Sequence, residues 1–141
     1  MAGSRARARD LLVRAIYQWQ IAGHEFSELV DQYQAMSEFR RVDADYFTAV
    51  LQAVVENSAV LDEVILKFAE RGLEQLDTVG RAVLLIAVAE LKFFADVPPK
   101  VVINEAVKLA KRYGPADSYR FVNAVTDRAA QLLRDPSPGD A

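Results

Sequence analysis

The stretch AVLLIAVAEL, residues 82–91, decides the fold class, because nine of its ten residues are apolar. A helix that is apolar on nearly all sides has to be buried among other elements. The stretch therefore predicts a central buried helix that begins at Asp77 or Thr78 and ends near Phe94. Its uninterrupted apolar run, residues 82–89, is much shorter than the roughly 20 residues that cross a bilayer, so no membrane association is predicted.

Apolar residues recur every three or four positions on both sides of this stretch, and Gly, Pro, Ser and Asp stand at the breaks. The pattern predicts further helices over residues 4–22, 27–37, from 43 to a break at Gly72, 99–113 and 118–134, the last capped by Asp117 or Ser118. No segment shows the period of two that a half-buried strand requires. We therefore predict an all-α single domain over residues 1–134, orthogonal or bundle-like, with a disordered tail at 135–141.

The composition argues against an enzyme. The chain has no cysteine, which excludes disulfides and thiolate metal sites, and its one histidine, His24, reads as a solvated loop residue. None of the HExxH, GxGxxG or phosphate-binding loop motifs occurs. No catalytic residue, cofactor or metal is therefore predicted. Because no long apolar segment follows the N-terminal arginines, a secretory signal is not expected, and the prediction is a cytoplasmic protein.

Two basic segments stand out in a chain whose net charge is -3. Residues 1–14 carry four arginines against one aspartate, a local charge of +3. Residues 100–120 again carry +3, from Lys100, Lys108, Lys111, Arg112 and Arg120 against Glu105 and Asp117. An acidic body with two basic segments indicates a localised anion site, and the phosphates of nucleic acids are anions that arginine pairs well.

In the predicted first helix, an aromatic residue accompanies the arginines. Tyr17 shares a face with Arg7 and Arg14, while Arg5 and Arg9 flank the edge of the opposite, apolar face. That apolar face comprises Ala8, Leu11, Leu12, Ala15, Ile16 and Trp19. A basic patch interleaved with aromatic rings is typical of proteins that stack the bases of single-stranded RNA.

The predicted last helix begins with a similar combination, in which Tyr119 and Phe121 surround Arg120. Two alternatives stay open for Phe121. Its ring either stacks on a base, or it belongs to the core stripe Phe121, Val122, Val125, Ala129 and Leu132.

Three segments resemble the NusB family of transcription antitermination factors. DVPPKVVINEAVKLAKRYGPADSYRFVNAVTDRAA, residues 96–130, resembles the family's C-terminal signature, in which INEAV, AK, YG, DS and FVN follow in this order. RARARDLLVRAIYQWQ, residues 5–20, resembles the family's basic start followed by A-x-x-x-LYxW. LDTVGRAVLLIAVAEL, residues 76–91, resembles LxxVERAxLRIAxYEL, so the resemblance covers most of residues 4–133.

The resemblance implies about seven helices in two packed helical bundles. It also implies binding of boxA, a short single-stranded leader RNA element, together with NusE, a small-subunit ribosomal protein. Other Nus factors and RNA polymerase are then indirect partners in bacterial antitermination on ribosomal RNA operons. The alternative is an all-helical protein adaptor whose arginines are incidental and which has no specific affinity for RNA.

The RNA contacts that the resemblance implies fall in the two basic segments. They come from the arginine-rich start, the tyrosine of the first helix and the DS-x-[KR]-F segment. With Arg14, which shares the face of Tyr17, the predicted RNA-binding residues are Arg5, Arg7, Arg9, Arg14, Tyr17, Asp117, Ser118, Arg120 and Phe121.

Some residues depart from the family pattern, namely Gly80, Leu85, Ala89, Ala124 and Thr126. Gly80 stands where the family usually has Glu, which with Asp77 would complete a capping box. The start of the central helix is therefore expected to be weaker than in the family.

Overall fold

The computed structural model describes residues 3–69 and 76–134, and every regular element within these ranges is helical. The elements are α1 (Ser4–Ala22), α2 (Phe26–Gln34), the 3₁₀ helix η1 (Ser37–Arg41), α3 (Ala44–Phe68), α4 (Thr78–Phe93), α5 (Pro99–Tyr113) and α6 (Ser118–Arg134). The all-α prediction is confirmed. The predicted break at Gly72 and the predicted tail at 135–141 lie outside the described residues. In the described ranges, no helix is both long and apolar enough to span a membrane.

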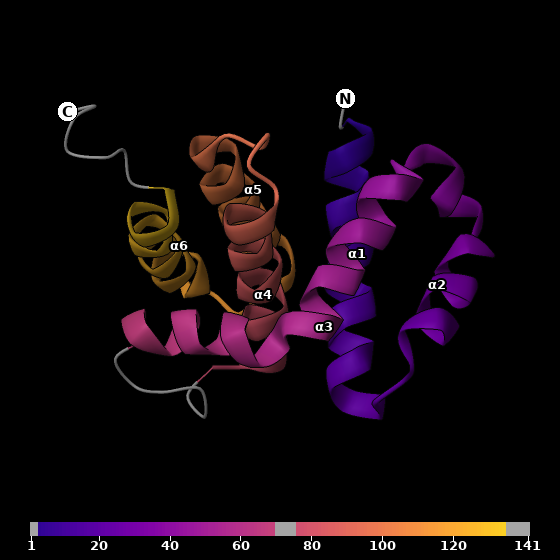
Figure 1. The fold of residues 1–141 in the computed structure, drawn as a ribbon, viewed down its shortest axis with the longest axis horizontal. Coiled ribbons are helices and arrows are strands. Elements are labelled where there is room, and N and C mark those ends of the chain that lie inside the picture. The colour runs from indigo at the N-terminus through magenta and orange to yellow at the C-terminus, as the bar shows by residue number, and fades with distance from the viewer. Residues whose placement is uncertain (1–2, 70–75, 135–141) are drawn as a thin grey trace.

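The helices form two groups, which Figure 1 shows side by side. α1, α2 and the first part of α3 make one group, and α4, α5 and α6 make the other. α4 joins the two, since it contacts α1 and α3 as well as α5 and α6. α2 and α6 lie at opposite sides of the molecule. This arrangement agrees with the predicted pair of packed bundles.

α4 is the buried centre of the molecule, as predicted. All ten residues of the stretch 82–91 are buried, including the charged Glu90. At the start of the helix, Asp77 occupies the N-cap position, but its side chain makes no capping hydrogen bond. A Cβ atom at Gly80 would lie 2.7 Å from Asp77 Oδ1, so a larger residue there requires the Asp77 side chain to move.

α3 is kinked at Asn57, and the kink allows a single helix to contact both groups. Asn57 has non-helical angles, φ -123° and ψ 20°, and its side-chain amide donates a hydrogen bond to the carbonyl of Ala53 at 2.9 Å. Such local side-chain bonds compete with the backbone ladder and bend helices. The predicted start at Asp43 is confirmed, because Asp43 Oδ1 accepts from the N–H of Tyr46 at 3.0 Å.

The segment between α1 and α3 differs from the prediction of one helix over residues 27–37. α2 starts just after Glu25, because Glu25 and Glu28 form a reciprocal capping box. It then ends at Gln34, and a separate 3₁₀ helix, η1, leads into α3. This extra element brings residues 37–41 next to α1.

Candidate nucleic-acid interface

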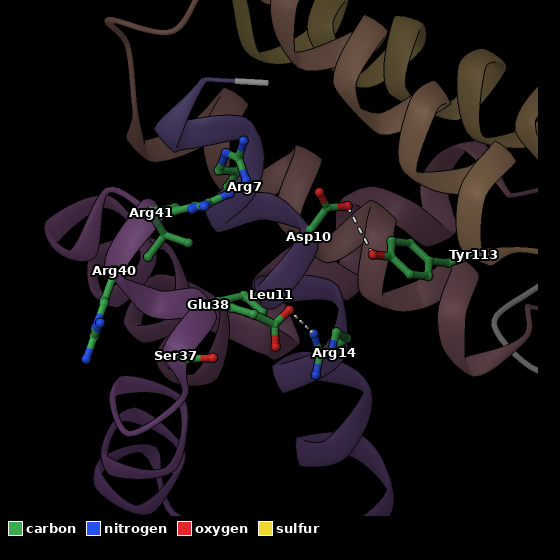
Figure 2. Close-up of a pocket in the computed structure, with 10 residues that line it drawn as sticks. Arg7, Asp10, Leu11, Arg14, Ser37, Glu38, Arg40, Arg41 and Tyr113 are labelled. Carbon is green, nitrogen blue, oxygen red and sulfur yellow. Dashed lines mark hydrogen bonds and ion pairs between the residues drawn. The ribbon is translucent and has the colours of Figure 1, made fainter. Parts of the chain in front are cut away.

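A groove between α1 and η1 is lined by four arginines (Figure 2). Arg7 and Arg14 stand on one face of α1, because residues seven apart are two helical turns apart. Arg40 and Arg41 are consecutive residues of η1. The hollow has a volume of about 490 Å³. We call this surface the arginine groove.

The η1 wall of the groove is anchored in the core. The ring of Phe39 packs edge-on against Phe47, with centroids 5.2 Å apart. Beyond η1, the N–H of Asp43 donates to the carbonyl of Ser4 at 3.1 Å, which joins the segment to the start of α1. Phe39 is partly buried against the core, whereas the two arginines that follow it are exposed.

The two acids that line the arginine groove already have partners. Asp10 accepts from Arg112 Nη1 at 2.6 Å and from the hydroxyl of Tyr113 at 3.1 Å. Glu38 accepts from Arg14 Nη1 at 3.1 Å. With four arginines and two carboxylates, the lining carries a net charge of +2 in a chain of net charge -3. A local positive field of this kind attracts phosphate.

An apolar cleft of about 460 Å³ adjoins the arginine groove along α1. Arg14 and Tyr113 line both hollows. Tyr17 is 43% exposed. Burial raises the pKa of Tyr113, so the hydroxyl of Tyr113 stays protonated at neutral pH. We call this hollow the aromatic cleft; its characteristic lining residues are Tyr17, Ile21, Val79 and Tyr113.

The start of α6 lines a third hollow, of about 630 Å³, with Phe121 and Ser118 among its residues. Phe121 is 37% exposed, so the alternative that placed its ring in the core is wrong. Leu132, at the other end of the predicted stripe, is 48% exposed. The buried face of α6 is turned slightly from the predicted one and comprises Val122, Val125, Thr126, Ala129 and Ala130.

A basic and aromatic cluster stands beside Phe121. Arg120 has a side chain that is 75% exposed; its Nε lies 3.3 Å from the hydroxyl of Tyr119 and 4.0 Å from Asp117 Oδ1. Lys111 Nζ lies 4.7 Å from the centroid of the Tyr119 ring. Asp117 has φ 69°, a left-handed conformation that forms the turn between α5 and α6.

Arg9, which the sequence analysis placed at the edge of the apolar face and among the RNA-binding residues, lies in the interior. Its side chain is 4% exposed, with Nη2 2.8 Å from Glu90 Oε2 and 3.2 Å from the hydroxyl of Tyr46. Its Nη1 also lies 3.6 Å from Glu105 Oε1. A buried carboxylate needs a cation beside it, and Arg9 meets that need for Glu90. We therefore remove Arg9 from the residues proposed to contact RNA.

Arg5 also lies apart from the arginine groove. Its guanidinium carbon is 4.4 Å from the centroid of the Tyr46 ring. The guanidinium forms ion pairs with Asp96 at 3.4 Å and Asp43 at 3.7 Å. The first helix thus brings together Arg7, Arg14 and Tyr17, but not Arg5 or Arg9.

Arg40 and Arg41 were not among the predicted site residues. Their signal in the sequence is the adjacent arginine pair in SEFRRV, residues 37–42. Because this pair lies in a short segment between two longer helices, sequence periodicity does not show which helix its side chains will face.

The chemistry that the described residues offer is electrostatic attraction and stacking. Among them, no group of three or more His, Cys, Asp or Glu side chains is placed to hold a metal ion.

Comparison with known proteins identifies the family. The NusB family model matches residues 6–131. The transcription antitermination protein NusB of Citrobacter koseri is 44% identical over 131 residues, which are 93% of this chain and 94% of the relative. NusB of T. maritima superposes with a TM-score of 0.77 at 27% identity, over 99% of this chain and 97% of that one.

A second solved structure contains partners. It is the crystal structure of the antitermination factors NusB and NusE in complex with double-stranded RNA, similar to this chain with a TM-score of 0.74 at 25% identity, over 90% of this chain and 96% of that one. The match of the family model over most of the sequence, together with relatives above 40% identity, is decisive: the chain belongs to the NusB family.

Proposed function

We propose that this chain is a transcription antitermination factor that binds boxA-type single-stranded leader RNA together with NusE and supports transcription of ribosomal RNA operons. Its curated relatives are transcription antitermination proteins, which supports the role. The solved complex of NusB, NusE and RNA supports the two partners. Other Nus factors and RNA polymerase are reached through that assembly.

The observation that carries the proposal is that the arginine groove and the aromatic cleft adjoin each other along α1. A nucleotide presents a charged phosphate and a flat base, so a strand that lies along α1 places phosphates on Arg7 and Arg14 and a base on Tyr17. Stacking on a protein ring requires a base that is free of its own duplex, which favours a single strand.

The start of α6 offers a second contact region for the same strand. Arg120 and the ring of Phe121 are both accessible there, beside Asp117 and Ser118. Cations and rings of this kind bind RNA but provide no nucleophile with its base. We therefore assign the chain no catalytic activity. We also treat residues 1–134 as one RNA-binding domain and place its function in the cytoplasm.

The test is a titration of labelled RNA followed by fluorescence anisotropy, with NusE present or absent. The probes are a boxA single strand, a scrambled strand of equal length and a boxA duplex, each measured from about 50 to 200 mM salt. We expect the boxA strand to bind most tightly, NusE to strengthen binding, and affinity to fall as salt rises. If the chain binds NusE but binds all three RNAs equally weakly, the protein-adaptor alternative is established instead.

A further inference from the structure

Arg40 and Arg41 are cations to which the described part of the fold supplies no anion. Both side chains are exposed, and neither makes a hydrogen bond or an ion pair with the residues that the structure describes. Of the two acids nearest to them in sequence, Glu38 is paired with Arg14 across the groove, and Asp43 caps α3 and pairs with Arg5. The η1 arginines therefore remain available to an external anion.

The second observation is the convergence of positive charge. Figure 2 shows the side chain of Arg41 extending from η1 toward Arg7 on α1, while Arg40 extends outward from the same segment. Like charges that share one groove repel each other, and a bound phosphate relieves that repulsion. Arg41 and Arg7 thus leave a place between the two walls that is complementary to an anion, and Arg40 adds positive charge at the outer edge of η1.

The third observation is that this wall is held in place before anything binds. Phe39 anchors η1 on Phe47, and Asp43, which follows η1, both bonds to the start of α1 and caps α3. An anion that binds there does not have to order the segment first, so little of the binding free energy is lost to ordering.

We infer that Arg41, with Arg40 beside it at the outer edge of η1, forms a second phosphate-binding wall opposite Arg7 and Arg14, and that this wall holds the backbone of a single-stranded RNA whose neighbouring base enters the aromatic cleft. This inference rests on the proposed function and extends it to η1. The aromatic cleft decides between RNA and an acidic peptide, because Arg14 and Tyr113 belong to both hollows and a nucleotide carries its phosphate and its base side by side.

The experiment compares three double variants of the full chain in the boxA anisotropy assay. Arg40→Ala/Arg41→Ala removes the η1 wall and Arg7→Ala/Arg14→Ala removes the α1 wall. Lys67→Ala/Lys92→Ala is the control, because it changes the net charge equally at exposed residues that line neither hollow. Thermal unfolding of each variant verifies that it is folded.

Losing two phosphate contacts reduces the salt slope of single-strand binding by about 1.4, which corresponds to roughly a tenfold loss of affinity at about 0.15 M salt. We expect that loss for Arg40→Ala/Arg41→Ala and no comparable change for the lysine control. Arg40→Lys/Arg41→Lys, which keeps both charges, should recover most of the salt slope.

Three results overturn the inference, and they differ in what they say of the proposed function. If the η1 variant binds boxA RNA like the lysine control while the α1 variant is weakened, the η1 wall is refuted and the proposed function stands. If the η1 variant loses affinity for NusE and keeps its affinity for RNA, the groove takes a protein. If the unmodified chain shows no preference for boxA RNA, the proposed function fails together with the inference.

Discussion

The buried pair of Arg9 and Glu90 leads to a strong prediction about stability. Three hydrogen bonds, of 2.8, 3.0 and 3.3 Å, join α1 to the C-terminal part of α4 through side chains that are 4% and 1% exposed. Arg9→Ala leaves the carboxylate of Glu90 buried without its main cation, and a loss of this kind costs about 3–5 kcal/mol. In a chain of this length, it lowers the Tm by roughly 10–20 °C.

Two variants control for other effects of this substitution. Arg5→Ala removes a nearby arginine whose side chain is 44% exposed, and it should cost at most about 1 kcal/mol. Arg9→Met/Glu90→Leu removes both charges and should recover most of the stability, because no buried charge is left unpaired. Urea titrations of the three proteins measure the differences. Equal unfolding midpoints for Arg9→Ala and Arg5→Ala would refute this reasoning.

The pH dependence separates the loss of a charge partner from the loss of packing. Burial raises the pKa of Glu90 above its ordinary value of 4.5, while the hydrogen bond and charge of Arg9 hold it down. A carboxyl with a raised pKa in the folded state contributes stability that is present below its unfolded pKa and is lost as the pH rises through the folded one. Without Arg9 the pKa of Glu90 rises further, so the cost of Arg9→Ala should grow as the pH is raised from the ordinary carboxyl value of 4.5 through neutrality. A cost that stays constant across this range would contradict the electrostatic explanation.

Four further substitutions test other parts of the fold and the interface. Arg134→Ala should lower the free energy of unfolding by roughly 2–3 kcal/mol in a urea titration, because the guanidinium of Arg134 ties α6 to the end of α4. It donates at 2.7 to 3.1 Å to the carbonyls of Glu90, Leu91, Phe94 and Val97. A change below about 0.5 kcal/mol would show that water replaces the guanidinium at these carbonyls. Trp19→Ala should lower the free energy of unfolding by about 3 kcal/mol, since the partly buried ring of Trp19 packs on the core. Tyr17→Ala, on the exposed face, should lower it by less than about 1 kcal/mol. If Tyr17→Ala lowers the Tm more than Trp19→Ala does, the faces of α1 are misassigned. Phe121→Ala should weaken boxA binding by ~1–3 kcal/mol with a smaller change in stability, and unchanged affinity per folded molecule would exclude stacking by this ring.

The helices and the centre of the fold follow from local features of the sequence. The stretch 82–91 is apolar on nearly all sides, so it is buried wherever its neighbours lie. In the same way, Pro99 and Gly114 mark the ends of α5, since backbone conformation depends mainly on nearby residues. The placement of Arg7, Arg14 and Tyr17 on one face of α1 follows from helical periodicity alone.

The tertiary structure decided which of the polar residues are available to a ligand. Periodicity placed Arg9 at the edge of α1. In the structure it lies in the interior, paired with Glu90 of α4, which is 81 residues away in sequence. Arg40 and Arg41 became part of the interface only because Phe39 anchors η1 beside α1. Phe121 lies at the surface because the buried face of α6 is set by its packing on α4 and α5. Each of these outcomes depends on a residue from another helix, and a local pattern carries no information about which helix that will be.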